Sequence, residues 1–305
     1  MGVVTPSLPV SIDIREVGPR DGLQSEAPVS VADRVALIEA LVTAGARHVE
    51  ICSFVSPRAV PAMAGGAEVV AALGVLAGVK RAALVPNLRG AEMAMRAGVD
   101  EITITLSASA VYSDKNVHMT IDQSVETVAS IASLVAGAVP VDAVISCAFG
   151  SPYEGDIDPA DVAALAERVM AVGATSVMYA DTTGMATPRR IAALLAVPSS
   201  AHVGAGLHLH DTRGTGLVNA YAGLLGGIRR FDTSVGGLGG SPFAAGAAGN
   251  VATEELVLLC DDLGVHTGFD LSALIEVAAM AALLVGHAVP SKVATSGPRL
   301  AQAVN

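Results

Sequence analysis

Short apolar runs alternate with longer amphipathic stretches along most of the chain. The short runs are rich in valine, isoleucine and threonine, which favours strands, and a run that is apolar at nearly every position indicates a strand buried on both faces. Eight strands are predicted in this way, at residues 12–17, 48–52, 81–85, 101–105, 143–148, 176–180, 206–209 and 231–235.

The stretches between these strands are rich in alanine and leucine and repeat their apolar positions at helical spacing, which predicts helices. These helices are expected at residues 31–44, 66–73, 90–97, 121–135, 159–172, 188–196 and 216–225. Gly45, Gly98 and Gly173 directly follow three of them, as expected of the glycine that often ends a helix.

Strands that alternate with helices predict an α/β fold with a parallel sheet. A doubly wound open sheet would also fit this alternation, but eight strand and helix units with a helical segment after them match a closed (β/α)8 TIM barrel better. We therefore expect one catalytic domain over residues 1–305, with the barrel at about 11–265 and a small C-terminal helical extension at about 266–305.

The composition excludes several classes of protein. The most apolar stretch, residues 271–289, contains Glu276 and His287, so it predicts a buried helix rather than a membrane span. A net charge of −11 argues against nucleic-acid binding, because no broad basic face is available to neutralise phosphates. No signal-like leader is recognised before the first predicted strand, and we expect a cytoplasmic protein with no membrane partner.

Polar and reactive side chains collect where the predicted strands end. In a TIM barrel the active site lies at the C-terminal ends of the strands. The groups at or just beyond these ends are Arg20, Asp21, Glu50, Ser53, Asn87, Ser107, Tyr153, Asp181, His208 and His210. The sequence therefore predicts a functional site at one rim of the barrel.

His208 and His210 lie two residues apart on a predicted strand, which turns both imidazoles to the same face. A lone strand histidine is more often a hydrogen-bonded core residue than a ligand, and the pair by itself fits either role equally well. Barrel closure, however, places strand 8 between strands 7 and 1, so Asp21 and Asn250 fall in the same sector. Two imidazoles, a carboxylate and an amide oxygen favour Mg²⁺ or Mn²⁺, and Co²⁺ or Zn²⁺ are also possible. Asn250 has a plain alternative role as the N-cap of a helix at 251–259.

Several separated segments resemble the motifs of the hydroxymethylglutaryl-CoA lyase family, metal-dependent TIM-barrel lyases related to the isopropylmalate and homocitrate synthases. These segments, in the family's order and spacing, are Glu-Val-Gly-Pro-Arg-Asp-Gly-Leu-Gln at 16–24, Val-Glu-Ile-Cys-Ser-Phe-Val-Ser-Pro at 49–57, Tyr-Ala-Asp-Thr-Thr-Gly at 179–184, the pair His208 and His210, and the glycine-rich run at 236–250. The resemblance implies that the metal ligands are Asp21, His208, His210 and Asn250, and that the catalytic or supporting residues include Arg20, Glu50 and Asp181.

The resemblance also implies the reaction, a retro-Claisen cleavage of 3-hydroxy-3-methylglutaryl-CoA to acetyl-CoA and acetoacetate. The cleavage requires removal of the 3-hydroxyl proton and stabilisation of the thioester enolate that departs. Arg20 is expected to hydrogen-bond the enolate without losing its own proton. Asp21, His208 or Asp181 is expected to carry the hydroxyl proton, and Glu50 to orient Arg20 or the groups around the metal.

The run at 236–250 contains six glycines and is expected to form a mobile lid. The family usually presents a cysteine at the position of Ser241, and its thiol is held to protonate the departing enolate. A serine hydroxyl is a far weaker acid, so another acid or water must act here, or the preferred substrate differs. Ser241 is nevertheless retained as a candidate catalytic residue.

A CoA substrate also requires partners for its phosphates and acyl chain. The expected substrate-binding residues are Gln24, Asn87, Tyr153, Arg58 and Lys115, with Arg89 and Arg213 as further candidates for the phosphates. Family members are often dimers, so the resemblance implies a homodimer.

Three alternative functions share much of this pattern. A lyase for a related 3-hydroxyacyl-CoA such as citramalyl-CoA would use the same residues. A condensing synthase shares the main motifs but usually carries a longer C-terminal extension. A catalytically weakened homologue that retained metal and CoA affinity would be consistent with Ser241 in place of the lid cysteine.

Overall fold

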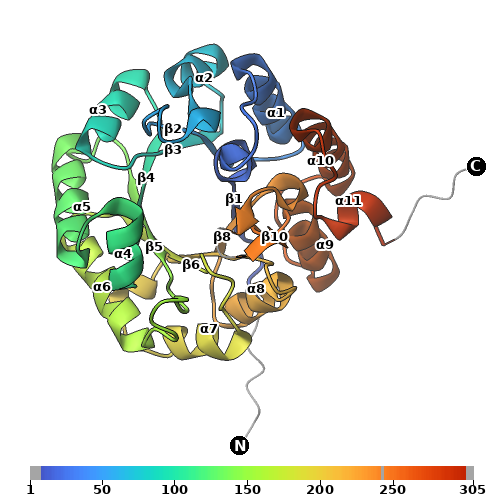
Figure 1. Cartoon of the computed structure of the whole chain (residues 1–305). Helices are drawn as coiled ribbons and strands as arrows, with labels where there is room; N and C mark the ends of the chain where they lie inside the picture. The colour runs from blue at the N-terminus through green and yellow to red at the C-terminus, as the bar shows by residue number, and fades with distance from the viewer. Residues whose placement is uncertain (1–7, 242–243, 300–305) are drawn as a thin grey trace, which may run out of the picture.

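The eight predicted strands form a closed barrel of parallel strands in sequence order, in which the last strand pairs with the first. The computed structural model describes residues 8–241 and 244–299, with the backbone alone described for residues 241 and 244–248. Figure 1 shows the helices as an outer ring around the barrel. The predicted (β/α)8 TIM barrel is therefore confirmed.

The sixth barrel strand has the predicted bounds, and each of the others begins or ends one or two residues from its predicted bounds. Their bounds are β1 (Asp13–Glu16), β2 (His48–Ser53), β3 (Lys80–Leu84), β4 (Glu101–Ser107), β5 (Val141–Ser146), β6 (Ser176–Ala180), β7 (Gly206–His208) and β8 (Arg230–Thr233). The largest difference is at β5, which ends before Cys147 because this residue has a φ of 56°. A left-handed backbone of this kind turns the chain out of the strand.

All seven predicted helices are present, and further helices complete the ring. The helices are α1 (Val31–Thr43), α2 (Gly66–Leu73), α3 (Leu88–Ala97), α4 (Ala110–Val117), α5 (Ile121–Val135), α6 (Pro159–Ala171), α7 (Pro188–Leu195), α8 (Gly216–Leu225), α9 (Thr253–Leu263), α10 (Leu271–Val285) and α11 (Lys292–Ser296). Side-chain caps fix several starts: Ser30 accepts from the amide of Asp33 at α1, and Thr120 forms a capping box with Gln123 at α5.

The C-terminal extension packs on the N-terminal part of the chain. In Figure 1, α10 lies beside α1 at the edge of the ring, and α11 lies beside α9. Only one face of α10 is buried, through residues such as Leu274 and Ala278, while Leu283 is exposed. Within residues 8–241 and 244–299, no helix is long and apolar enough to cross a membrane.

The core forms between the barrel and the helix ring. Leu37 of α1 is fully buried in this layer, so its replacement by alanine leaves a cavity. We expect Leu37→Ala to lower the free energy of unfolding by about 2–5 kcal/mol in urea denaturation. Leu283→Ala is the matched control, because Leu283 is 83% exposed, and it should change this free energy by no more than about 0.5 kcal/mol. Equal losses in both variants would contradict this description of the core.

Candidate metal centre and catalytic rim

The turn after β1 brings the side chains of Arg20 and Asp21 to the rim. Gly18–Gly22 form a short π-helical turn, η1, with Pro19 as its second residue, and the amides of Asp21 and Gly22 donate to the carbonyl of Val17 at 2.7 and 3.2 Å. The buried Glu16 carboxylate stabilises the start of this turn, since it accepts a hydrogen bond from the amide of Gly18 at 2.8 Å. Burial raises the pKa of Glu16 to about 7.

Asp21, His208 and His210 form a compact group of possible metal ligands. One ligand atom from each lies within 4.8 Å of the others. His208 Nε2 is 3.3 Å from His210 Nε2 and 3.8 Å from Asp21 Oδ2. One carboxylate and two imidazoles at this spacing could hold a divalent metal ion.

Asn250 lies beside this group. Its Nδ2 donates to Asp21 Oδ2 at 2.8 Å, and its backbone pairs with His210, which lies beyond the end of β7. The alternative role of Asn250 as a helix N-cap is wrong, because α9 begins at Thr253 and Ala252 occupies the cap position. Asn250 Oδ1 is buried and has no hydrogen-bond partner among the described residues.

The protonation states of Asp21 and His210 suit metal ligation. Burial, followed by the charge of His208, lowers the pKa of His210 to about 3, so its imidazole is neutral and can act as a ligand. Burial alone would raise the pKa of Asp21, but the charges of Arg20 and His208 lower it to about 2, so its carboxylate is ionised at neutral pH. With Asn250 Oδ1 unpaired as well, the donor set suits a divalent metal.

Arg20 lies between two carboxylates beside the metal group. Its Nε donates to Glu50 Oε2, and its Nη1 donates to Asp21 Oδ1 at 2.6 Å. Nη1 also donates to Gln24 Oε1 at 3.4 Å, which connects an expected substrate-binding residue to the same guanidinium. Burial alone would lower the pKa of Arg20, but Glu50 and Asp21 raise it. The guanidinium is therefore a permanently charged donor at the rim.

Asp181 is buried just beyond β6. Its Oδ1 accepts from the amide of Ala186 at 2.8 Å, and its Oδ2 has no hydrogen-bond partner among the described residues. Burial raises the pKa of Asp181 to about 7. A carboxyl group with this pKa can both accept and release a proton at neutral pH. Arg213 donates to the carbonyls of Thr183 and Gly184, so it holds the loop that follows Asp181.

The other expected substrate-binding residues have different surroundings. Lys115 Nζ lies 5.3 Å from the centre of the Tyr153 ring, so these two side chains meet. Asn87 Oδ1 accepts from the amide of Gly90 at 3.0 Å and caps α3. Arg58 and Arg89 are exposed, in the loop after β2 and in α3.

The glycine-rich run after β8 forms a small antiparallel hairpin of β9 (Gly240–Ser241) and β10 (Ala244–Ala248). Ser241 ends β9, and its side chain lies outside the described part of the molecule. The hairpin returns to Asn250 through Gly249, where a Cβ would lie only 2.1 Å from the carbonyl oxygen of Gly239. This close approach of two backbone segments beside the metal group requires glycine.

The sequence pattern did not single out Asp232, which contacts the metal group from inside the barrel. Its Oδ2 lies 3.2 Å from His208 Nδ1. The sequence indicated Asp232 only indirectly, as a carboxylate inside a strand predicted to be buried, because a buried charge needs a partner. That partner is Arg15 on β1, which forms two hydrogen bonds with the Asp232 carboxylate.

Comparison with known proteins places this arrangement in a family. The HMGL-like family model matches residues 11–281. The chain is 42% identical over 295 residues to the 3-hydroxy-3-isohexenylglutaryl-CoA/hydroxy-methylglutaryl-CoA lyase of Pseudomonas aeruginosa, and the match covers 94% of this chain and 97% of that protein. It is 41% identical over 310 residues to the (R)-citramalyl-CoA lyase of Chloroflexus aurantiacus, covering 97% and 98%.

A solved structure agrees with these matches. An HMG-CoA lyase from Acinetobacter baumannii in complex with coenzyme A and 3-methylmalate superposes with a TM-score of 0.90 at 36% identity, and the match covers 99% of both chains. The relatives carry the same class of activity on different acyl groups. The chain therefore belongs to the HMGL-like family and is an acyl-CoA carbon–carbon lyase of the HMG-CoA lyase type.

Proposed function

We propose that the protein cleaves 3-hydroxy-3-methylglutaryl-CoA to acetyl-CoA and acetoacetate. The observation that carries this proposal is the contact between Arg20 and Asp21, at 2.6 Å. It sets a charged hydrogen-bond donor directly beside the candidate metal ligands. A retro-Claisen cleavage needs both groups in one place, one to activate the 3-hydroxyl and the other to stabilise the enolate.

We propose that Asp21, His208, His210 and Asn250 hold one Mg²⁺ or Mn²⁺, although the donor set also suits Co²⁺ or Zn²⁺. A cation bound there supplies a Lewis acid that lowers the pKa of the substrate's 3-hydroxyl. The unpaired Asn250 Oδ1 and the neutral His210 imidazole support this ligand set.

The remaining chemistry is assigned to the side chains around this group. Asp181, with a pKa of about 7, accepts the 3-hydroxyl proton, and the C2–C3 bond breaks as the ketone of acetoacetate forms. The bonding electron pair passes to the thioester, and Arg20 donates hydrogen bonds to the enolate oxygen while it stays protonated. Ser241, another acid or water then donates a proton to C2, which yields acetyl-CoA. Glu50 holds Arg20 in position by accepting the hydrogen bond that Arg20 Nε donates.

The CoA moiety is assigned to the open side of the rim. Lys115 and Tyr153, which contact each other, and the exposed Arg58 are the proposed partners of the CoA chain and its phosphates. Gln24, which accepts a hydrogen bond from Arg20, is assigned to the acyl group of the substrate. Asn87 is also assigned to substrate binding, at the edge of this site. The relative from Acinetobacter baumannii, whose structure contains coenzyme A, supports a CoA thioester as the substrate.

A second candidate substrate is citramalyl-CoA. The relative from Chloroflexus aurantiacus is an (R)-citramalyl-CoA lyase with 41% identity over nearly the whole chain. Its identity to this chain is almost the same as that of the Pseudomonas aeruginosa lyase, at 42%. Overall similarity therefore does not distinguish the two substrates, and Ser241 provides the most direct test.

Removal of bound metal should abolish cleavage. We expect exhaustive dialysis against EDTA to give an inactive protein that Mg²⁺ or Mn²⁺ restores, because the 3-hydroxyl is not sufficiently acidic without a cation. The measurement is the rate of acetyl-CoA release, with metal content determined for each sample. Full activity in a protein shown to be metal-free would contradict the proposed metal dependence.

Loss of the Arg20 guanidinium should impair chemistry rather than metal binding. We expect Arg20→Met to lower kcat by about 10²–10³-fold, the usual loss for one key electrostatic donor. Mn²⁺ should bind at least as tightly as in the wild type, because a positive charge beside Asp21 is removed. Arg96→Met on α3 is the control, since the Arg96 side chain is 68% exposed, and it should leave kcat unchanged. Unchanged turnover in Arg20→Met would show that Arg20 is only structural.

Substitution of Ser241 should distinguish the two substrates. If the serine replaces a better acid in 3-hydroxy-3-methylglutaryl-CoA cleavage, Ser241→Cys should raise kcat for this substrate, because a thiol with a pKa of about 8.5 is a far stronger acid than a hydroxyl. Steady-state rates on both thioesters provide the measurement. Activity that stays near zero on 3-hydroxy-3-methylglutaryl-CoA, together with high wild-type activity on citramalyl-CoA, would make citramalyl-CoA the substrate.

A further inference from the structure

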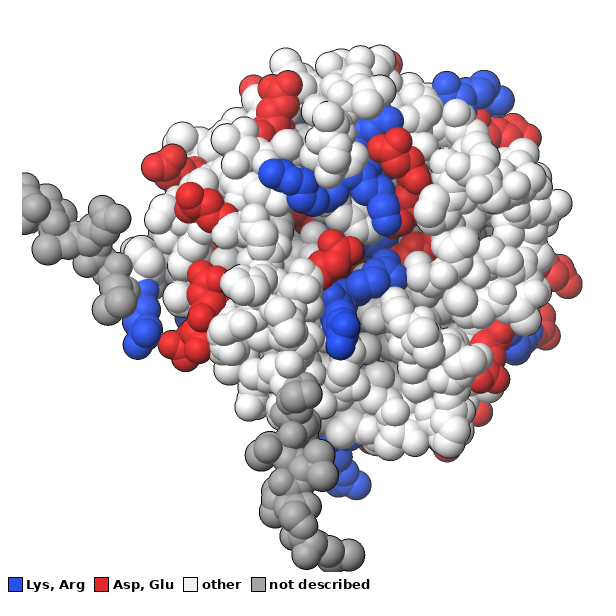
Figure 2. Space-filling view, turned by 180° about the vertical axis from the view of Figure 1, so that it is seen from behind, with Lys and Arg blue, Asp and Glu red and all other residues white. Residues whose placement is uncertain are grey.

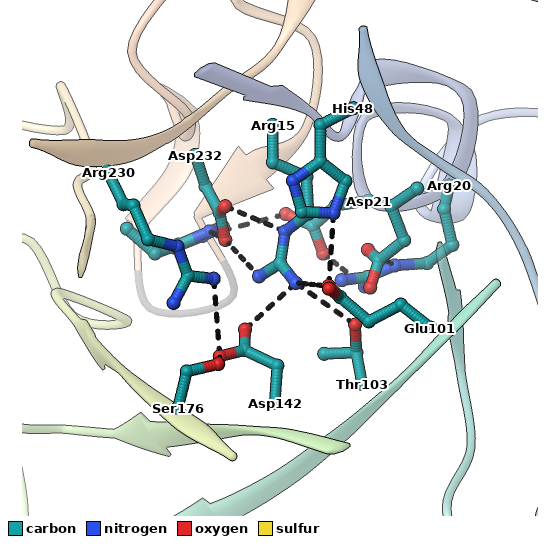
Figure 3. A network of polar contacts seen from close by, with 12 residues as sticks. Arg15, Arg20, Asp21, His48, Glu101, Thr103, Asp142, Ser176, Arg230 and Asp232 are labelled. Carbon is teal, nitrogen blue, oxygen red and sulfur yellow. Dashed lines mark hydrogen bonds and ion pairs between the residues drawn. The ribbon is translucent and has the colours of Figure 1, made fainter. Parts of the chain in front are cut away.

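A buried carboxylate, Asp232 of β8, stands between the metal group and the interior of the barrel. On one side its Oδ2 lies 3.2 Å from His208 Nδ1. On the other side it accepts two hydrogen bonds from Arg15, from Nε at 2.9 Å and from Nη2 at 2.8 Å. Figure 3 shows Asp232 and Arg15 face to face at the centre of a polar network. All three side chains are buried.

We infer that Asp232, clamped by Arg15, is a positioning residue that keeps the proton of His208 on Nδ1 and so presents Nε2 to the metal. The inference rests on the proposed function, because it takes His208 as a metal ligand. It adds to that function the group that decides which ring nitrogen of His208 is available.

The hydrogen-bonding geometry supports this assignment. A carboxylate that is paired bidentately with a guanidinium can only accept hydrogen bonds. His208 Nδ1 must therefore be the donor to Asp232, and the lone pair of a neutral ring then lies on Nε2. Nε2 is the atom that faces His210 Nε2 at 3.3 Å and Asp21 Oδ2 at 3.8 Å. A carboxylate behind a ligating histidine is a general way to fix the ring and its tautomer.

Arg15 itself is fixed from three other strands. Its Nη1 donates to Glu101 at 3.2 Å and to Thr103 at 3.1 Å, both on β4, and lies 2.9 Å from Asp142 on β5. Because Asp232 on β8 binds Nε and Nη2 of the same guanidinium, the guanidinium has little freedom to rotate. Asp232 is thus held rigidly, as a positioning residue must be.

The network continues to the opposite end of the barrel. Glu101 contacts His48 at 3.0 Å and Lys80 at 3.4 Å, and Asp142 contacts Arg230 at 3.3 Å. Lys80 and Arg230 begin their strands, and Figure 2 shows charges of both signs gathered at the centre of the face opposite to that of Figure 1. The network is not a proton path, since Arg15 interrupts it and does not release its proton. It serves as a rigid support for Asp232.

The second histidine of the metal group lacks such a support. His210 Nδ1 is buried without a hydrogen-bond partner among the described residues. The two imidazoles are therefore held differently, His208 by a carboxylate and His210 by the pairing of its backbone with Asn250. Of the two imidazoles, a change at Asp232 should therefore affect only that of His208.

The test is Asp232→Asn, measured by metal binding without substrate. An asparagine amide in this place has two possible orientations. Its N–H can donate to His208 Nδ1, which moves the ring proton to Nε2. Alternatively, its N–H faces Arg15, itself a donor, and the contact that fixes the asparagine side chain in place is lost. We expect the Kd for Mn²⁺, determined from the EPR signal of free Mn²⁺, to rise by about 10–100-fold. The absorption bands of bound Co²⁺ should also change, because the geometry of one ligand is altered.

Asp142→Asn is the matched control. Asp142 also pairs with Arg15 but lies on the far side of the guanidinium and contacts no member of the metal group among the described residues. The substitution removes one carboxylate from the same network, so it should leave the Mn²⁺ affinity near the wild-type value. Circular dichroism and thermal unfolding of both variants establish that the barrel is intact.

A measurement on the wild-type protein keeps the inference testable even if Asp232→Asn does not fold. In the Zn²⁺-loaded protein, the ¹⁵N shifts of the His208 ring, assigned by comparison with His208→Gln, should show the proton on Nδ1. A ring metallated at Nδ1 would overturn the inference, as would Asp232→Asn with wild-type Mn²⁺ affinity or Asp142→Asn with an equal loss. A wild-type protein that binds no divalent metal would instead overturn the metal site of the proposed function.

Discussion

Closure of the barrel between β8 and β1 is the constraint on which the site depends. The register of this pair sets Arg15 opposite Asp232 and Glu16 opposite Thr233, so residues more than two hundred positions apart become neighbours. Only this seam brings the turn that carries Asp21 against the segment that carries Asn250, where the two side chains hydrogen-bond. The metal group therefore exists only in the closed barrel.

The same seam carries the buried ionisable side chains of Arg15, Glu16 and Asp232, and each has defined partners. Glu16 accepts from the amides of Gly18 and Val235 and from the hydroxyl of Thr253, so a single carboxylate joins the turn after β1 to the segment after β8. Arg15, the residue before Glu16, forms an ion pair with Asp232, and the two charges neutralise each other. Because unpaired charges in the interior are costly, these pairs fix the register of the seam as well as the position of the ligands.

The rim combines two kinds of group that the proposed chemistry needs. Arg20 is a permanent donor whose charge is kept by Glu50 and Asp21, whereas Asp181 has a pKa of about 7 because burial disfavours its charged form. One group stabilises negative charge and the other exchanges protons, and their surroundings create this difference. Family membership defines the reaction class, while the residues that contact the acyl group decide which thioester is cleaved.

The sequence alone determined the eight strands, the helices between them and the rim where the candidate site lies, because hydrophobic period and strand-end chemistry are local properties. Tertiary structure decided the rest. Cys147 ends β5 early through its backbone conformation, and Asn250 pairs with His210 instead of capping α9. The pairing of Arg15 with Asp232 was also invisible to periodicity. A contact between distant residues depends on the register at which the barrel closes, and no short stretch of sequence contains that register.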